Sequence, residues 1–189
     1  MLAEQLKKDT LTNHQQLEKM LVGRMKAIRS KEDYVELLQL FYSYFGGLEK
    51  LIDQHLDKSI LPDYDQRRKS ASLAQDITSL GGTPPNVATG EALPLINNHL
   101  QAMAALYVIE GSTLGGKFIS KMIAQQLNII DGAGLSFFNS YGDNTEVMWN
   151  TFKEAMNRQS SSALVNHEVI ATANDTFARF KAWAERPLA

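Results

Sequence analysis

The sequence contains no cysteine. This absence excludes disulfide bonds, zinc sites with thiolate ligands, iron–sulfur clusters and catalysis by a thiol nucleophile. Histidine, aspartate, glutamate, methionine and tyrosine remain as the residue types that could bind a metal or take part in catalysis.

Long apolar runs are also absent. The longest, residues 102–109, is far shorter than the roughly 20 residues that a membrane-spanning helix needs. The N-terminal residues show no apolar core of a signal peptide. With 19 basic and 21 acidic residues and no sustained basic run, the chain lacks the usual signature of a nucleic-acid-binding protein. We expect a cytoplasmic protein whose partners include neither a membrane nor nucleic acid.

Alternating β-strand patterns bounded by hairpin turns are missing as well, whereas apolar residues recur at helical spacing almost throughout. The 189 residues suffice for one well-buried core and are few for two domains. The sequence therefore predicts an all-α fold with a single domain, residues 1–189. The expected helices cover about residues 4–22, a segment from the capping box at Ser30 to before Pro62, a segment from Asp65 to before Gly81, and about residues 97–127, 145–158 and 162–184.

One segment combines an apolar helical pattern with several glycines. Residues 105–119 read ALYVIEGSTLGGKFI and include Gly111, Gly115 and Gly116. A glycine inside a helix costs about 1 kcal/mol relative to alanine, so the three together cost roughly 3 kcal/mol. Glycine lets a helix bend and lets a ligand approach the backbone, but it also allows close packing between helices. The segment alone favours these two interpretations equally.

Of the four histidines, only His14 has neighbours that favour a ligand role. Helical spacing places His14 on the apolar face that carries Leu17 and Leu21, so its side chain is expected to point inward. Glu18 follows one turn later and could orient a metal-bound imidazole. A histidine packed in the core without any ligand is the alternative. The other three histidines, His55, His99 and His167, are expected to be ordinary surface or packing residues.

Several classes of protein require motifs that this chain lacks. A di-iron helical bundle needs Glu-x-x-His pairs, and none occurs. Ser112 does not stand in the Gly-x-Ser-x-Gly turn that serine hydrolases place after a strand. The glycine spacing around Ser112 fits neither a dinucleotide-binding fold nor a phosphate-binding loop. These absences disfavour a di-iron protein, a serine hydrolase and a nucleotide-binding enzyme.

Two segments together resemble a known family. Residues 10–18 read TLTNHQQLE, and residues 106–116 read LYVIEGSTLGG. In this combination the chain resembles the heme oxygenase family, and most strongly its bacterial, biliverdin-producing members. The resemblance implies a single-domain, multi-helix fold in which heme lies between a proximal helix with a histidine ligand and a kinked, glycine-rich distal helix.

Carried over to this chain, the resemblance implies a set of site residues. His14 is the expected iron ligand. The expected catalytic residues of the distal helix are Gly111, Ser112, Gly115 and Gly116. The expected heme-binding residues are Lys7, His14, Glu18, Phe45, Lys117 and Lys153, with Lys7 and Lys153 near the propionates. Ser112 and Phe45 stand where mammalian members have an aspartate and a tyrosine, so the distal hydrogen-bond network is expected to differ from theirs.

The resemblance also implies the reaction. Heme is both cofactor and substrate, and its oxygen-dependent cleavage at a meso carbon gives biliverdin, carbon monoxide and ferrous iron. Because the chain has no flavin or nicotinamide motif, the electrons are expected from an external donor such as a ferredoxin-like protein or a reductase. One alternative is a sensor or carrier that binds heme through His14 without degrading it. Another is a helical fold relative that acts on a different small molecule, such as a thiamin-degrading or quinone-cofactor enzyme. Thiamin hydrolysis in that group resembles a cysteine-dependent reaction, and this chain has no cysteine.

Overall fold

The computed structural model describes residues 1–187, and every regular element in this part of the chain is helical. The α-helices are α1 (Leu2–Asp9), α2 (Leu11–Ala27), α3 (Lys31–His55), α4 (Ser70–Ser79), α5 (His99–Gly111), α6 (Thr113–Leu127), α7 (Thr145–Arg158) and α8 (Ala163–Ala184). Short 3-10 helices η1 (Tyr64–Gln66), η2 (Gly90–Ala92) and η3 (Gly142–Asn144) lie in the connections. The predicted all-α fold is confirmed. The predicted domain of residues 1–189 also includes residues 188 and 189, which lie outside the described part.

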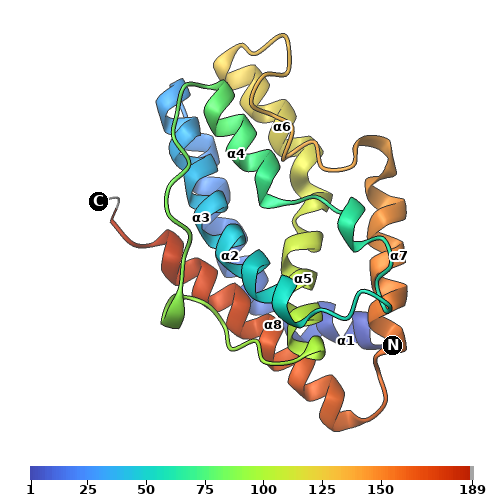
Figure 1. Cartoon of the computed structure of the whole chain (residues 1–189). Helices are drawn as coiled ribbons and strands as arrows, with labels where there is room; N and C mark the ends of the chain where they lie inside the picture. Colours follow the sequence, from blue (N-terminus) through green and yellow to red (C-terminus); the bar gives the residue numbers. More distant parts are fainter. Residues whose placement is uncertain (188–189) are drawn as a thin grey trace.

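Helix α5 lies near the centre of the fold (Figure 1). It packs most extensively against α8 and also against α3, and α4 packs on α3. Helix α7 contacts α1, α5 and α6, whereas α2 packs mainly on α8. No helix of residues 1–187 is long and apolar enough to cross a membrane.

The core between α3 and α8 is rich in aromatic side chains. Tyr44 of α3 stacks on Phe180 of α8 with ring centroids 4.6 Å apart. Phe45 lies against Phe180 and Phe137, at centroid distances of 5.2 and 6.0 Å. Such aromatic pairs contribute about 0.5–1.5 kcal/mol beyond their buried area. This cluster joins α3 and α8, the two helices that pack most extensively against α5.

The ends of several helices lie where the sequence predicts them. Ser30 Oγ accepts a hydrogen bond from the Asp33 amide, and the Asp33 carboxylate accepts one from the Ser30 amide, so the predicted capping box is present. Helix α7 has the predicted bounds, and α8 begins one residue later than predicted. These helices carry strong local signals in their own sequence.

The predicted first helix is wrong, because it is divided at Thr10 into α1 and α2. The Thr10 hydroxyl donates to the Leu6 carbonyl at 2.6 Å, in competition with the regular backbone pattern. Leu6 and Thr10 are buried, and so is Leu17 on α2, but His14 between them is exposed. The expectation that His14 points inward is wrong in that its side chain stays exposed, although it shares the face of α2 that carries Leu17 and stacks on Phe177.

The predicted helix over residues 97–127 is also divided, at Ser112, into α5 and α6. The Ser112 hydroxyl donates to the Ile109 carbonyl, and the Thr113 hydroxyl donates to the Glu110 carbonyl, both at 2.6 Å. Two successive hydroxyls thus bond to carbonyls of the last turn of α5, which bends the helix. The break lies next to Gly111, as expected for a kinked distal helix.

Asp65 does not cap the third predicted helix. It lies within η1 and forms an ion pair with Lys58, at 2.6 Å. The helix itself, α4, begins only at Ser70, where the Glu49 carboxylate accepts hydrogen bonds from the Ser70 amide and hydroxyl. Beyond α4, Gly81 has a φ of +83°, which matches the predicted glycine stop.

Candidate functional site

Helix α2 and the α5–α6 segment come together at two places. At one end, the Thr10 side chain contacts Tyr107; burial raises the pKa of Tyr107, and this contact partly lowers it. At the other end, the Gln126 amide donates to the carbonyl oxygens of Lys26 and Ile28, at 3.2 and 3.4 Å. Among the described residues, α2 otherwise packs on α8 rather than on α5 or α6. The stretch of α2 between the two contacts therefore runs alongside α5–α6 without extensive packing.

His14 lies in this stretch of α2, one turn after Thr10. Its ring stacks on Phe177 of α8, with centroids 5.3 Å apart and an interplanar angle of 28°. Phe177 is buried, whereas His14 is exposed. Glu18 is exposed too, and none of the ion pairs in residues 1–187 joins it to His14. Helix α8 thus supports the imidazole from one side and leaves it accessible to a ligand.

The three glycines at the break have different surroundings. A Cβ on Gly116 would overlap the Phe138 carbonyl oxygen, so this buried position requires glycine for packing. A Cβ on Gly115 would meet only Ile119, at an ordinary distance of 3.9 Å, and Gly115 is exposed. A Cβ on Gly111 would likewise make only an ordinary contact. Packing therefore explains Gly116 but neither Gly111 nor Gly115.

Large apolar side chains are exposed beside Gly115. Leu114 precedes it and Phe118 follows it by one helical turn, and they are 51% and 67% exposed. Leu11 at the start of α2 and Val147 on α7 are exposed as well. Covering apolar surface contributes about 25 cal/mol per Å². This face of α6 therefore favours a flat, apolar ligand that can approach the backbone at Gly115.

Charged residues are buried on the other side of the break. Glu110, in the last turn of α5, accepts hydrogen bonds from Arg67 at 2.6 Å and from the Tyr141 hydroxyl at 2.9 Å. Arg67 also donates two hydrogen bonds to Asp63. Burial alone lowers the pKa of Arg67, but Glu110 and Asp63 together raise it above its ordinary value. Loss of one partner from such a buried pair typically costs about 3–5 kcal/mol.

Arg68 is buried next to this ion pair and reaches the break itself. One terminal nitrogen donates to the Ile109 carbonyl at 3.0 Å and to Ser112 Oγ at 2.6 Å. The other donates to the Phe137 carbonyl at 3.1 Å and to Ser140 Oγ at 3.2 Å. Burial lowers the pKa of Arg68 to about 10, so the guanidinium remains charged at neutral pH. Ser112 is thereby bound to the interior of the protein.

The predicted lysines lie on three different helices. Lys7 is exposed in the last turn of α1. Lys117 is exposed on α6 and forms an ion pair with Asp143 at 3.5 Å. Lys153 is half-buried on α7, with its ammonium 5.9 Å from the centre of the Trp149 ring.

Phe45, by contrast, is only 2% exposed and belongs to the aromatic core between α3 and α8. Phe45 therefore contributes to core packing and not to the exposed face around His14 and Gly115. Its role in binding a ligand stays a prediction.

The sequence analysis did not identify Arg67, Arg68 or Tyr141. One signal was available for their partner Glu110, which directly follows the apolar run of residues 102–109 and so needs a buried partner of opposite charge. The partner itself could not be found from the sequence, because Arg67 lies 43 residues away in a connection without helical periodicity.

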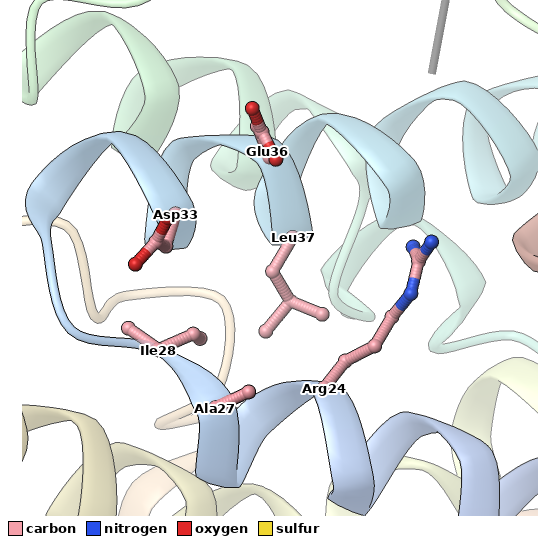
Figure 2. A pocket seen from close by; sticks show the side chains of 6 residues that line it. All are labelled: Arg24, Ala27, Ile28, Asp33, Glu36 and Leu37. Atoms are coloured by element: carbon pink, nitrogen blue, oxygen red, sulfur yellow. The ribbon is translucent and has the colours of Figure 1, made fainter. Parts of the chain in front are cut away.

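A surface pocket lies at the other end of α2. Figure 2 shows its lining residues, which come from the end of α2 and the start of α3: Arg24, Ala27, Ile28, Asp33, Glu36 and Leu37. None of the predicted site residues lines this pocket. The exposed face around His14 and Gly115 is therefore the stronger candidate site.

Known proteins resemble this chain over most of its length. A curated heme oxygenase of Xanthomonas campestris pv. campestris (strain 8004) is 27% identical over 149 residues, which cover 79% of this chain and 87% of the relative. Heme oxygenase 1 of Synechocystis sp. (strain ATCC 27184 / PCC 6803 / Kazusa) is 24% identical over 194 aligned residues, covering 94% of this chain and 80% of the relative.

Solved structures share the fold. The NO- and CO-bound heme oxygenase from Neisseria meningitidis has a TM-score of 0.83 at 23% identity and covers 97% of this chain and 90% of its own. Heme oxygenase-1 from Synechocystis sp. PCC6803 in complex with heme has a TM-score of 0.74 at 21% identity, with coverage of 97% and 90%. The sequence model of the heme oxygenase family matches residues 1–186. The chain therefore belongs to the heme oxygenase family.

Proposed function

We propose that this chain is a heme oxygenase that uses His14 as the iron ligand and converts heme to biliverdin, carbon monoxide and ferrous iron. Dioxygen and electrons from an external donor complete the reaction. Family membership supports the activity and supports heme as the bound group. The observation that carries the proposed site is Gly115, an exposed helical glycine without a packing reason to lack a side chain, beside exposed Leu114 and Phe118.

The residues of this region fit a heme. Leu114 and Phe118 offer apolar surface to a flat ring, and Gly115 allows that ring to approach the backbone of α6. A porphyrin supplies nitrogen ligands of its own to the iron, so the imidazole of His14 would suffice as the protein's ligand. Within residues 1–187, no group of three or more histidine, aspartate and glutamate side chains could hold a metal ion alone. The accessible His14 suits iron that arrives already bound to a porphyrin.

Bound heme would supply both the redox-active iron and the ring that is opened. The protein would hold and shield it. His14, stacked on Phe177, would offer a neutral nitrogen from α2, which favours oxygen binding without the strong electron donation of a thiolate. On α6, Gly115 would leave room at the reacting face, and Leu114 and Phe118 would exclude water from it.

The remaining distal residues would act from behind the helix. Gly116 packs against Phe138, and the Ser112 hydroxyl hydrogen is directed at the Ile109 carbonyl. Both therefore support the shape of the distal backbone. Glu18, one turn from His14, would adjust the imidazole through water, since the two side chains form no direct ion pair.

Lys7, Lys117 and Lys153 would pair with the propionates at the solvent edge. Exposed ion pairs contribute only about 0–1 kcal/mol each, and Lys117 would first have to leave Asp143. These lysines would orient heme more than they would hold it. A cytoplasmic location and a ferredoxin-like or reductase donor are part of this proposal and rest on the sequence.

The proposal is tested by titrating hemin into the wild-type protein, His14→Ala and, as a control, His167→Ala, which replaces an exposed histidine on α8. We expect a histidine-ligated visible spectrum for the wild type and the control, and its loss in His14→Ala. Adding ascorbate or a reductase system in air should then give biliverdin and carbon monoxide. A stable wild-type heme complex without ring opening would contradict the proposed heme oxygenase activity and would support the alternative of a heme sensor or carrier. An unchanged spectrum in His14→Ala would contradict the assignment of His14 as the iron ligand.

A further inference from the structure

Arg68 joins two parts of the chain that determine the direction of the distal helix. Its hydrogen bonds to the Ile109 carbonyl and to Ser112 Oγ reach the last turn of α5. Its hydrogen bonds to the Phe137 carbonyl and to Ser140 Oγ reach the loop between α6 and α7. We call this set of four hydrogen bonds the Arg68 bridge.

The loop held by the bridge also touches α6 directly. Gly116 lies so close to the Phe138 carbonyl that no Cβ fits between them. Asp76 of α4 fixes the same loop by accepting hydrogen bonds from the amides of Ser136 and Phe137, at 3.2 and 2.8 Å. Helix α6 therefore rests on a loop that Arg68 connects to the end of α5. The angle between α5 and α6 depends on that connection.

The chemistry of the bridge favours a positioning role over simple stabilisation. The guanidinium is buried and lies over the Phe137 ring, with 3.8 Å between Cζ and the ring centre. None of its side-chain hydrogen bonds goes to a carboxylate, and its Nε has no partner in the described chain. A buried charge with an unpaired donor is expensive, and an apolar side chain would avoid that cost. What Arg68 provides instead is a planar fork that fixes four acceptors in one geometry.

We propose that Arg68 is a positioning residue that sets the break between α5 and α6, and through it the place of Gly115 over the bound heme. This inference rests on the proposed function. Because Arg68 is buried and bonds to residues 109 and 112, whereas Gly115 is exposed, Arg68 would act only through the backbone of residues 109–116. The consequence concerns which edge of the ring is presented for cleavage rather than whether heme binds.

The test compares Arg68→Lys, which keeps the charge but loses the planar fork, with Arg29→Lys as a matched control. Arg29 also donates to carbonyls near a helix end, those of Lys26 and Ile28 after α2, but it lies far from the break in the sequence. In the heme-free proteins, we expect amide hydrogen exchange of residues 110–118 to accelerate about tenfold or more in Arg68→Lys and to stay unchanged in Arg29→Lys. Exchange in α3 should change little in either variant.

The second readout is the distribution of biliverdin isomers at equal heme occupancy, which a loss of global stability alone would not alter. Arg68→Lys should shift this distribution, and Arg29→Lys should not. Wild-type isomers together with wild-type exchange of residues 110–118 in Arg68→Lys would overturn the inference. If Arg68→Lys does not fold, the same two measurements are made on the double variant Ser112→Ala and Ser140→Ala. This variant removes one hydrogen-bond acceptor of Arg68 at the end of α5 and one in the loop between α6 and α7. Failure of the wild type to open heme would refute the proposed function, whereas the exchange measurement would still test the bridge.

Discussion

At the scale of single residues, the neighbouring glycines Gly115 and Gly116 have different surroundings. Gly116 is buried against the Phe138 carbonyl, while Gly115 next to it is exposed and nearly without contacts. Packing therefore explains Gly116, whereas the approach of a ligand to the backbone stays a prediction for Gly115. The sequence does not show this difference, because it depends on Phe138, which lies in the loop after α6 and packs back against Gly116.

The two positions should respond differently to alanine. Gly116→Ala places a Cβ against a fixed carbonyl and should lower the free energy of unfolding by about 1–3 kcal/mol. Gly115→Ala meets no obstacle and should raise it by up to about 1 kcal/mol through helix propensity. Urea denaturation of the heme-free proteins, followed by circular dichroism, measures both. Equal effects of the two substitutions would show that Gly116 is not constrained by packing.

The candidate site was predictable to different extents at different residues. The resemblance singled out His14 and Gly115, and the structure leaves both accessible. Periodicity placed His14 on the same face of α2 as Leu17, but it could not show that His14 stays exposed beside Phe177. Arg68 could not be found at all, since neighbouring lysines and arginines look alike in a sequence until their acceptors are known.

At the scale of elements, helix α5 depends on a contact at its first residue. The Asp57 amide donates to Nδ1 of His99 at 2.9 Å, which ties the end of α3 to the start of α5. This bond requires a neutral imidazole with Nδ1 as the acceptor. A positive charge there would also be unfavourable beside the N-terminus of a helix.

This contact should make stability depend on pH. Burial lowers the pKa of His99 below its ordinary value of 6.5, against the opposing effects of Asp57 and Gln159. Folding therefore favours the neutral form, and its contribution is complete above the unfolded pKa and is lost as the pH falls through the folded pKa. In urea denaturation, the stability of wild type relative to His99→Gln should thus decrease between about pH 8 and pH 5. The same difference at both pH values would contradict this role for His99.

The helices themselves were predictable where the signals are local. The Ser30–Asp33 capping box marked the start of α3, and helical periodicity gave α7 and α8. The breaks at Thr10 and Ser112 were missed because each arises when a hydroxyl bonds to a backbone carbonyl within an otherwise helical pattern. Such bonds are options that threonine and serine have in any helix.

At the scale of the whole molecule, helix α2 packs on α8, and α5 packs on both α8 and α3. In the described part of the chain, Thr10 before α2 contacts Tyr107 of α5, and Lys26 near the end of α2 accepts a hydrogen bond from Gln126 of α6. His14 and Gly115 lie between those contacts and are both exposed. The arrangement leaves one accessible imidazole on α2 and one accessible stretch of backbone on α6, which is what a heme bound between them requires.

Heme turnover by Gly115→Leu tests most directly whether Gly115 faces the bound heme, as proposed. Gly23→Leu is the matched control, because Gly23 is also an exposed helical glycine, with nothing within 4 Å of an added Cβ. Both variants should fold. With hemin, a reductant and air, we expect Gly23→Leu to form biliverdin at the wild-type rate and Gly115→Leu to be slower by about a hundredfold or more, because its side chain displaces the reacting groups. Wild-type turnover by Gly115→Leu would show that α6 does not face the heme at this residue.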